Sequence, residues 1–261
     1  MSYETLDIER QGAVATVWMN RPEVFNAFNE QLIDDLAAAC RALEGDACVR
    51  VVVLAGRGRH FSAGADLNWM QRASACTEAE NLADARKFAA MLQALSGLSK
   101  PTIARVQGAA LGGGTGLAAA CDMVVAADNA QFSTSEVKFG IIPAVISPYV
   151  LRAIGPRHAL RYFQTAEKFS AAEAKAIGLV SELVTLDELD AGVAKLVQAL
   201  LTGGPLAQQA AKELIAAISG RQIDAAVGEE TALRIARQRA GAEAREGITA
   251  FLHKRPAAWQ T

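Results

Sequence analysis

The sequence predicts an α/β fold in which short strands alternate with helices and a mainly helical C-terminal region follows. Two observations support this prediction. In the first half, apolar or alternating runs of strand length are separated by glycine-rich turns and by stretches with helical spacing. From Ala171 onward, Ala, Leu, Glu, Lys and Arg dominate at helical spacing. We therefore expect a strand–helix core at 1–195 and a helical region at 196–261.

The individual strands follow from local signals in chain order. The first two alternate apolar and polar residues on either side of Gln11-Gly12, which indicates a β-hairpin. The third is a β-branched run typical of a buried strand. Expected strands cover 5–10, 14–20, 49–55, 102–106, 123–127, 131–133 and 179–184.

Helix starts and stops are equally readable. Asn29 is placed to cap a helix that runs to about Glu44, and Gly45 is placed to end it. A long amphipathic stretch at 78–95 predicts a second helix. The run at 108–122 predicts a glycine turn that enters a helix of small residues.

Composition excludes several classes of protein. The 261 residues contain 26 Lys and Arg against 28 Asp and Glu, with no basic stripe, so we expect no nucleic-acid partner. The four cysteines lie far apart with no C-x-x-C pair, so we expect no metal site and no disulfide framework. The first ten residues show no basic region followed by an apolar core, so we expect no secretory signal, and no apolar run approaches the roughly 18 residues that span a bilayer. A soluble cytoplasmic protein without a membrane partner is expected.

Two glycine-rich turns, at 60–66 and 112–116, are the most informative local features. Neither matches a phosphate-binding pattern, and a single glycine turn is most often only a tight turn. Each, however, follows a strand and precedes a helix, so each leaves unpaired backbone N–H groups at a helix N-terminus. Two such donors that converge form an oxyanion hole, which suits a thioester oxygen that gains charge as an enolate forms.

Such a site also needs a group that carries a proton. Glu136 follows the strand expected at 131–133 and precedes an apolar segment, where desolvation would raise its pKa; an exposed carboxylate paired with Lys138 is the alternative. His60, Ser62 and Asp66 cluster on one loop, but no G-x-S-x-G motif accompanies them, so a serine hydrolase is not expected.

Taken together, these motifs resemble the crotonase (enoyl-CoA hydratase/isomerase) superfamily over essentially the whole chain. Each motif is weak alone, whereas their order and spacing are specific. The matching motifs are Asn20-Arg21-Pro22, Asn26-Ala27-Phe28, 61–67, Lys100-Pro101, 108–114, Cys121-Asp122, Phe132 with Glu136, 140–143, and Phe251 with Lys254-Arg255.

The resemblance implies a crotonase-like spiral of ββα units with a C-terminal helical trimerisation region, assembled as a homotrimer or as a homohexamer (a dimer of trimers). It implies an acyl-CoA thioester substrate and no separate cofactor. The N–H groups of Ala65 and Gly113 are expected to bind the thioester oxygen, and Glu136 to move the proton. Other residues expected at the substrate and CoA site are Asn26, Ala27, Phe28, Ala63, Gly64, Asp66, Leu67, Gly112, Gly116, Tyr149, Phe251 and Lys254.

Three of these expectations are more detailed. Phe251 and Lys254 match positions that reach the adenine and phosphate bound by a neighbouring subunit, and Asp66 matches a position that is mostly structural in the family.

Two-glutamate hydratases carry a glutamate two residues after the Gly-Gly-Gly run and a second one 20 residues later. Here these positions hold Gly116 and Glu136, so only the second carboxylate is present.

The expected reaction is syn addition of water across an α,β-unsaturated acyl-CoA. The local sequences at 65–70, 135–138 and 143–149 most resemble those of bacterial 3-methylglutaconyl-CoA hydratases of leucine breakdown. The related isohexenylglutaconyl-CoA hydratases of terpene breakdown are a close alternative. Either acyl group carries a distal carboxylate. The alternatives are a double-bond isomerase that uses Glu136 alone, and a catalytically silent acyl-CoA-binding subunit. Candidates to bind the distal carboxylate are Arg72, Lys138, Tyr149 and Arg152.

Overall fold

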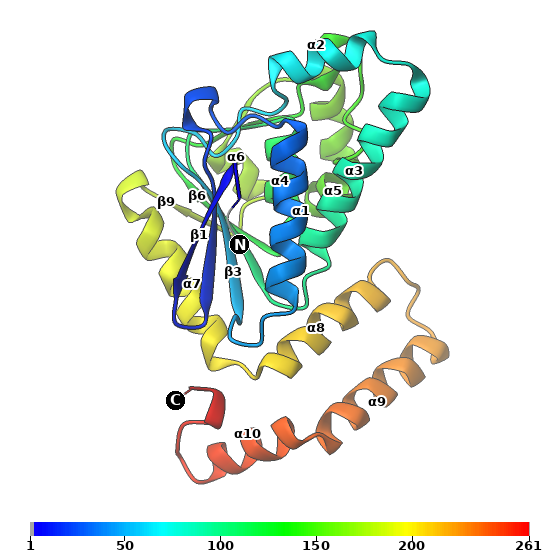
Figure 1. The fold of residues 1–261 in the computed structure, drawn as a ribbon. Coiled ribbons are helices and arrows are strands. Elements are labelled where there is room, and N and C mark those ends of the chain that lie inside the picture. Colours follow the sequence, from blue (N-terminus) through cyan, green and yellow to red (C-terminus); the bar gives the residue numbers. More distant parts are fainter. Residues whose placement is uncertain (1–2, 261) are drawn as a thin grey trace.

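A computed structural model describes residues 3–260. Its main sheet has six strands in the order β1-β2-β3-β4-β6-β9, and a smaller sheet has the order β5-β7-β8 (Figure 1). The strands are β1 Leu6–Gln11, β2 Val14–Met19, β3 Val51–Gly56, β4 Thr102–Val106, β5 Ala109–Leu111, β6 Met123–Ala127, β7 Gln131–Ser133, β8 Phe169–Ser170 and β9 Glu182–Val184. The α-helices are α1 Glu30–Glu44, α2 Leu67–Ala75, α3 Glu78–Ser96, α4 Gly113–Ala120, α5 Ser147–Thr165, α6 Ala171–Ala176, α7 Leu189–Thr202, α8 Pro205–Ile218, α9 Ala225–Ala240 and α10 Ala242–Leu252.

The N-terminal elements form as their sequence predicts. β1 and β2 pair antiparallel in a register that joins Gln11 to Val14, and Gly12 has φ +57°, which suits the tight turn between them. The side chain of Asn29 accepts a hydrogen bond from the N–H of Leu32 and so caps α1. The predicted hairpin and the first predicted helix are confirmed.

The parallel part of the main sheet is covered on both faces. All six residues of β3 are buried, because Val52 and Leu54 face the core beneath α1, α3 and α4 while Val51 and Val53 face α7. Alternate side chains of a strand point to opposite faces, so a strand between two helical layers must be apolar throughout. This two-sided burial fixes the end of β3, where the first glycine-rich turn begins.

The structure differs from the sequence-based expectation in the middle of the chain. The strand expected at 179–184 is limited to β9, because Leu179 and Val180 turn into the core before pairing begins. A helix was expected directly after the turn at 60–66, where α2 lies, but its bounds were not predicted, and α5 was not expected. α5 is interrupted at Gly155, which has φ +70° and precedes Pro156, so its periodicity is broken in the sequence.

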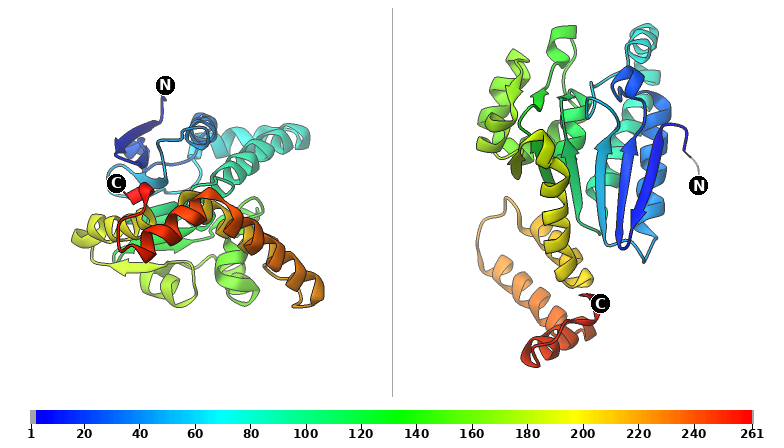
Figure 2. Two further views of the ribbon diagram at one scale, coloured as in Figure 1. Left: turned by 90° about the horizontal axis from the view of Figure 1, so that it is seen from below. Right: turned by 90° about the vertical axis from the view of Figure 1, so that its left-hand side faces the viewer.

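The C-terminal helices form an arm that extends away from the core (Figures 1 and 2). The expected boundary after residue 195 lies within α7, which buries Leu189, Val193 and Val197 against the sheet. The chain leaves the sheet only after α7 ends, at Gly203. On the arm, α8 has no buried residue and α9 has only one. Among residues 3–260, no helix is both long and apolar enough to cross a membrane.

Candidate active site

The two glycine-rich turns run side by side in the same direction. The N–H of Ser62 donates to the carbonyl of Ala109 at 2.9 Å, and the N–H of Leu111 donates to the carbonyl of Ser62 at 3.0 Å. These bonds pair Ser62 with Ala110 in a parallel register. Further along, a Cβ on Gly64 would lie 2.8 Å from the carbonyl oxygen of Leu111 and 3.8 Å from the nitrogen of Gly112, and the next residues, Ala65 and Gly113, line the same cavity. Backbone pairing therefore brings together two turns that are 48 positions apart in the sequence.

The backbone N–H groups of Ala65 and Gly113 are both free. Phe28 forms a parallel bridge with Ala65: the N–H of Phe28 donates to the carbonyl of Gly64, and the carbonyl of Phe28 accepts from the N–H of Asp66. In a parallel bridge of this kind, the N–H of the central residue, here Ala65, points away from the paired segment. Gly113 is the first residue of α4, whose first-turn N–H groups lack intrahelical acceptors. Neither N–H finds an acceptor within residues 3–260. This is the donor arrangement that an oxyanion hole requires.

Close packing requires glycine at position 64 and leaves little room for a side chain at position 113. A Cβ at Gly64 would lie 2.8 Å from the carbonyl oxygen of Leu111, and φ at Gly64 is +93°. A Cβ at Gly113 would lie 3.1 Å from ring atoms of both Phe28 and Phe88. The glycines therefore permit the approach of one turn to the other and of the aromatic rings to the free amide.

Glu136 lies next to this pair of turns. The smaller sheet carries it there: β7 pairs with β5, and the N–H of Gly112 donates to the carbonyl of Ser133 at 2.7 Å. Oε1 of Glu136 lies 3.3 Å from the position that a Cβ on Gly112 would occupy, and Oε2 is buried and has no hydrogen-bond partner among residues 3–260. Burial raises the pKa of Glu136 above its usual value, only partly offset by a backbone hydrogen bond. A carboxyl group in this state suits general acid–base catalysis near neutral pH.

The turns and Glu136 open into one cavity of about 850 Å³. Its wall is mostly apolar, and the only ionisable carboxyl groups on it are those of Asp84 and Glu136. No Lys, Arg or His from the described residues lines it. The lining residues are Phe28, Ala63, Gly64, Ala65, Leu67, Trp69, Met70, Asn81, Asp84, Ala85, Phe88, Leu111, Gly112, Gly113, Ser135, Glu136 and 139–146.

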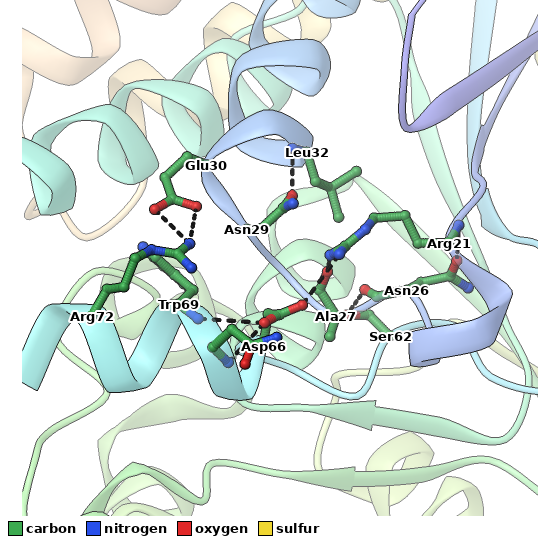
Figure 3. A network of polar contacts seen from close by, with 11 residues as sticks. Arg21, Asn26, Ala27, Asn29, Glu30, Leu32, Ser62, Asp66, Trp69 and Arg72 are labelled. Carbon is green, nitrogen blue, oxygen red and sulfur yellow. Dashed lines mark hydrogen bonds and ion pairs between the residues drawn. The ribbon is translucent and has the colours of Figure 1, made fainter.

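A polar network behind the first turn holds it in place (Figure 3). The buried side chain of Asn26 donates to the carbonyls of Arg57 and His60 and accepts from the N–H of Arg21. Asp66 caps α2 by accepting from the N–H of Trp69 and also pairs with Arg21 at 3.2 Å. Asn26 and Asp66 do not line this cavity and support the turn from behind it, which for Asp66 is the structural role that the family resemblance implies. Their expected contact with CoA stays a prediction.

The same region excludes the serine-hydrolase alternative. Oγ of Ser62 is buried and donates to the carbonyl of Asn26, while Nδ1 of His60 accepts from the N–H of Ala109. Asp66 is engaged with Arg21 and the start of α2. The three side chains make no contact with one another in these interactions, so they form no catalytic triad.

Gly116, the position of the missing glutamate, is filled from the opposite side. It lies one turn after Gly112 on α4, and a Cβ there would come within 2.2 Å of Cγ2 of Ile146. Ile146 is itself buried and lines the cavity. The cavity wall therefore carries the carboxyl group of Glu136 beside Gly112 and the aliphatic side chain of Ile146 beside Gly116. A glutamate at 116 would require Ile146 to be displaced.

The remaining expected site residues lie away from this cavity. Ala27 is buried and its carbonyl accepts from Arg21, and Tyr149 is half-buried against the core. Phe251 and Lys254 lie at the end of α10, on the arm at the far end of the molecule from α2 (Figure 1). Their expected contact with a neighbouring subunit stays a prediction.

None of the four candidates for binding a distal carboxylate lines the cavity. Arg72 instead donates to both carboxyl oxygens of Glu30 at 2.8 Å. Lys138 and Arg152 are exposed, and Arg152 lies over the ring of Tyr149. Sequence proximity to the motifs was therefore a poor guide to which side chains face the cavity.

Sequence reasoning missed the wall contributed by α2 and α3. Asn81, Asp84, Ala85 and Phe88 all line the cavity. Their spacing of i, i+3, i+4 and i+7 marks one face of a helix, and this pattern was available in the sequence. It mixes polar and apolar residues, however, and so gives no hydrophobic stripe.

Comparison with known proteins decides the family. Residues 9–261 match the family model described as enoyl-CoA hydratase/isomerase. The chain belongs to the enoyl-CoA hydratase/isomerase family. It is 38% identical to a crotonyl-CoA hydratase of Syntrophomonas wolfei, over 98% of each chain. It is 36% identical to a 2,3-dehydroadipyl-CoA hydratase of Escherichia coli, over 96% of each chain.

Solved structures of this family share the fold. A Legionella pneumophila protein described as an enoyl-CoA hydratase/isomerase (crotonase) matches with a TM-score of 0.94 and 43% identity, over 99% of this chain and 100% of that one. Pseudomonas aeruginosa AtuE matches with a TM-score of 0.93 and 35% identity, over 99% and 100%. The predicted crotonase-like α/β fold is thereby confirmed.

Proposed function

We propose that this protein hydrates α,β-unsaturated acyl-CoA thioesters with one carboxylate. Glu136 accepts a proton from water as the water oxygen attacks Cβ, and the electron pair of the double bond moves to the thioester oxygen. The N–H groups of Ala65 and Gly113 stabilise that oxygen as an enolate. Glu136 then returns the proton to Cα, so water adds to one face of the double bond.

One observation carries the proposal. The Glu136 carboxyl group, with one buried oxygen unpartnered, lines the same cavity as the two free amides. A buried acceptor without a partner costs free energy unless a ligand satisfies it, and a water molecule or the acidic Cα–H of an acyl thioester would do so. The hydratase names of the relatives favour water over a proton shift within the substrate as the reaction.

A panel of enoyl-CoA thioesters tests the proposal. We expect loss of absorbance at the conjugated enoyl-thioester band, together with a 3-hydroxyacyl-CoA product that is 18 Da heavier, about the mass of one water, by mass spectrometry. A shifted double bond without a gain in mass would favour the isomerase alternative. Tight CoA binding with no turnover of any thioester would favour a silent binding subunit.

The preferred acyl group in our proposal is 3-methylglutaconyl or a similar branched chain with a distal carboxylate. The motif spellings at 65–70, 135–138 and 143–149 support it. A cavity of about 850 Å³ has room for a branched chain. Crotonyl-CoA, the uncharged substrate named for one relative, is the comparison compound in the panel.

We also propose that the protein assembles as a trimer or a dimer of trimers through the C-terminal arm. Large apolar side chains are exposed along it, where water would otherwise surround them. They include Leu206, Ile215, Leu233, Ile235, Ile248, Phe251 and Leu252. Light scattering after size exclusion should give about three or six times the chain mass of 27.5 kDa; a monomeric mass would contradict the assembly.

A further inference from the structure

The part of the cavity wall formed by α2 and α3 carries a carboxyl group that the hydration mechanism does not use. Oδ2 of Asp84, on α3, accepts a hydrogen bond from Nε1 of Trp69, on α2, at 3.0 Å. Both side chains line the cavity. The second carboxyl oxygen of Asp84 forms no hydrogen bond to residues 3–260. The Trp69 donor fixes the orientation of the carboxyl group and leaves one oxygen for a ligand.

The position of Asp84 matches the reach of a short acyl chain. Cζ of Phe88 lies 3.1 Å from the position that a Cβ on Gly113 would occupy, so this ring lies beside the residue whose N–H we propose to bind the thioester oxygen. Asp84 lies one helical turn before Phe88, a shift of about 6 Å along α3. In an extended acyl chain, the fifth carbon lies about 5 Å from the thioester carbon. An acyl chain that runs along α3 from Phe88 would therefore bring a carboxyl group on its fourth carbon to the level of Asp84.

The charges around Asp84 do not provide a cation for that carboxyl group. Arg72 on α2 is bound to Glu30 of α1, and Lys87 on α3 pairs with Asp34 of α1 at 3.9 Å and does not line the cavity. Among the described residues that line the cavity, the other one with an ionisable carboxyl group is Glu136. Burial raises the pKa of Asp84, and the hydrogen bond from Trp69 offsets part of that rise; the charge of Glu30 adds a smaller increase, which the charges of Lys87 and Arg72 oppose.

We propose that Trp69 and Asp84 form the subsite for a terminal carboxyl group of the acyl chain, which binds by sharing one proton with Asp84. Two carboxyl groups at hydrogen-bond distance cannot both be ionised, whereas a pair that holds one proton forms a short O–H···O⁻ bond. Binding then takes up one proton from solvent, which is released when the product leaves. This inference rests on the proposed hydratase function. It assigns the residues that would recognise the terminal carboxyl group of the acyl chain.

The test compares kcat/KM for 3-methylglutaconyl-CoA and for the uncharged 3-methylcrotonyl-CoA across pH. Their ratio cancels the titration of Glu136, which affects both substrates. In the wild type, we expect the ratio to fall as pH rises, up to about tenfold per pH unit, as the shared proton is lost. In Asp84→Asn, whose amide donates without a titrating proton, the ratio should be independent of pH.

Two further variants separate proton sharing from other roles of Asp84. Asp84→Ala, which has no donor, should lower the ratio at least about tenfold at about pH 6, where the shared proton is present. Trp69→Phe removes a donor to Asp84 and should shift the fall of the ratio to higher pH. Glu78→Gln removes a charge from an exposed site on α3 and serves as the matched control, with no change expected.

The outcomes are distinct. An unchanged or raised ratio in Asp84→Ala at low pH would mean simple repulsion and would overturn the proposal. Equal losses for both substrates would indicate a purely structural role and would also overturn it. If the wild type hydrates 3-methylcrotonyl-CoA but its ratio does not depend on pH, the subsite fails while the hydratase function stands. If the wild type hydrates neither of these two thioesters nor any other in the panel, the proposed function itself fails.

Discussion

Replacing Glu136 with Gln should reduce hydration by about 10²–10⁴-fold while leaving CoA binding nearly unchanged. Gln has the same shape but cannot accept a proton from water or return it to Cα. The amides of Ala65 and Gly113 stay in place, so the thioester should still bind. Turnover numbers and the dissociation constant for CoA, measured on the same preparation, check both halves of this expectation. Retention of more than about a tenth of wild-type turnover would contradict the role of Glu136.

The pH dependence of wild type and variant gives an independent check. Glu136 must be ionised to accept a proton, so kcat/KM should fall as pH drops through its pKa, which burial raises above the usual 4.5. The raised pKa also affects stability. The folded state favours the protonated carboxyl group, so its contribution is present below the unfolded pKa and is lost as pH rises through the folded pKa.

Glu136→Gln has no carboxyl group to ionise and should avoid that loss. Thermal unfolding should therefore show the variant gaining stability relative to wild type as pH is raised, with the smallest difference at acidic pH. The same comparison serves as the folding control for the activity measurement. A variant that unfolds more readily than wild type at neutral pH would make lost activity uninformative and would contradict an unpartnered, buried carboxylate.

Replacing Gly64 with Ala should reduce turnover by about 10²–10³-fold, the effect of losing one oxyanion donor. The new Cβ would lie 2.8 Å from the carbonyl oxygen of Leu111, and φ at this position is +93°. The contact is with backbone, so relief requires the two turns to move apart. That movement separates the amides of Ala65 and Gly113. Activity on the best substrate of the panel, compared with the free energy of unfolding, measures the effect.

Gly12→Ala is the matched control for backbone strain. Gly12 also has a positive φ, of +57°, but nothing lies within 4 Å of its Cβ position. This variant should lose about 1–2 kcal/mol of stability and keep its activity. If Gly64→Ala is destabilised to a similar degree yet turns over substrate at the wild-type rate, the approach of the two turns is not what places the oxyanion donors.

Sequence reasoning identified the reacting groups because each sits beside a strong local signal. Ala65, Gly113 and Glu136 follow short strands, and the two turns can be recognised in the sequence because they are rich in glycine. The structural role of the Asn26 side chain was not foreseen: its motif suggested contact with the substrate, whereas its amide group also makes hydrogen bonds to three backbone groups. A buried asparagine and a ligand-binding asparagine look alike until their hydrogen-bond partners are known.

The amino-acid sequence alone determined the α/β class, the hairpin, the capped first helix, the family pattern and the single carboxylate. Each of these depends on neighbouring residues or on fixed spacing. Only the tertiary structure decided that Ile146 fills the space at Gly116, that Arg72 is bound to Glu30, and that Asp84 faces the cavity. Each of these facts concerns side chains from segments far apart in the chain. Packing and charge pairing bring such segments together, and these long-range contacts produce no repeating pattern in the sequence.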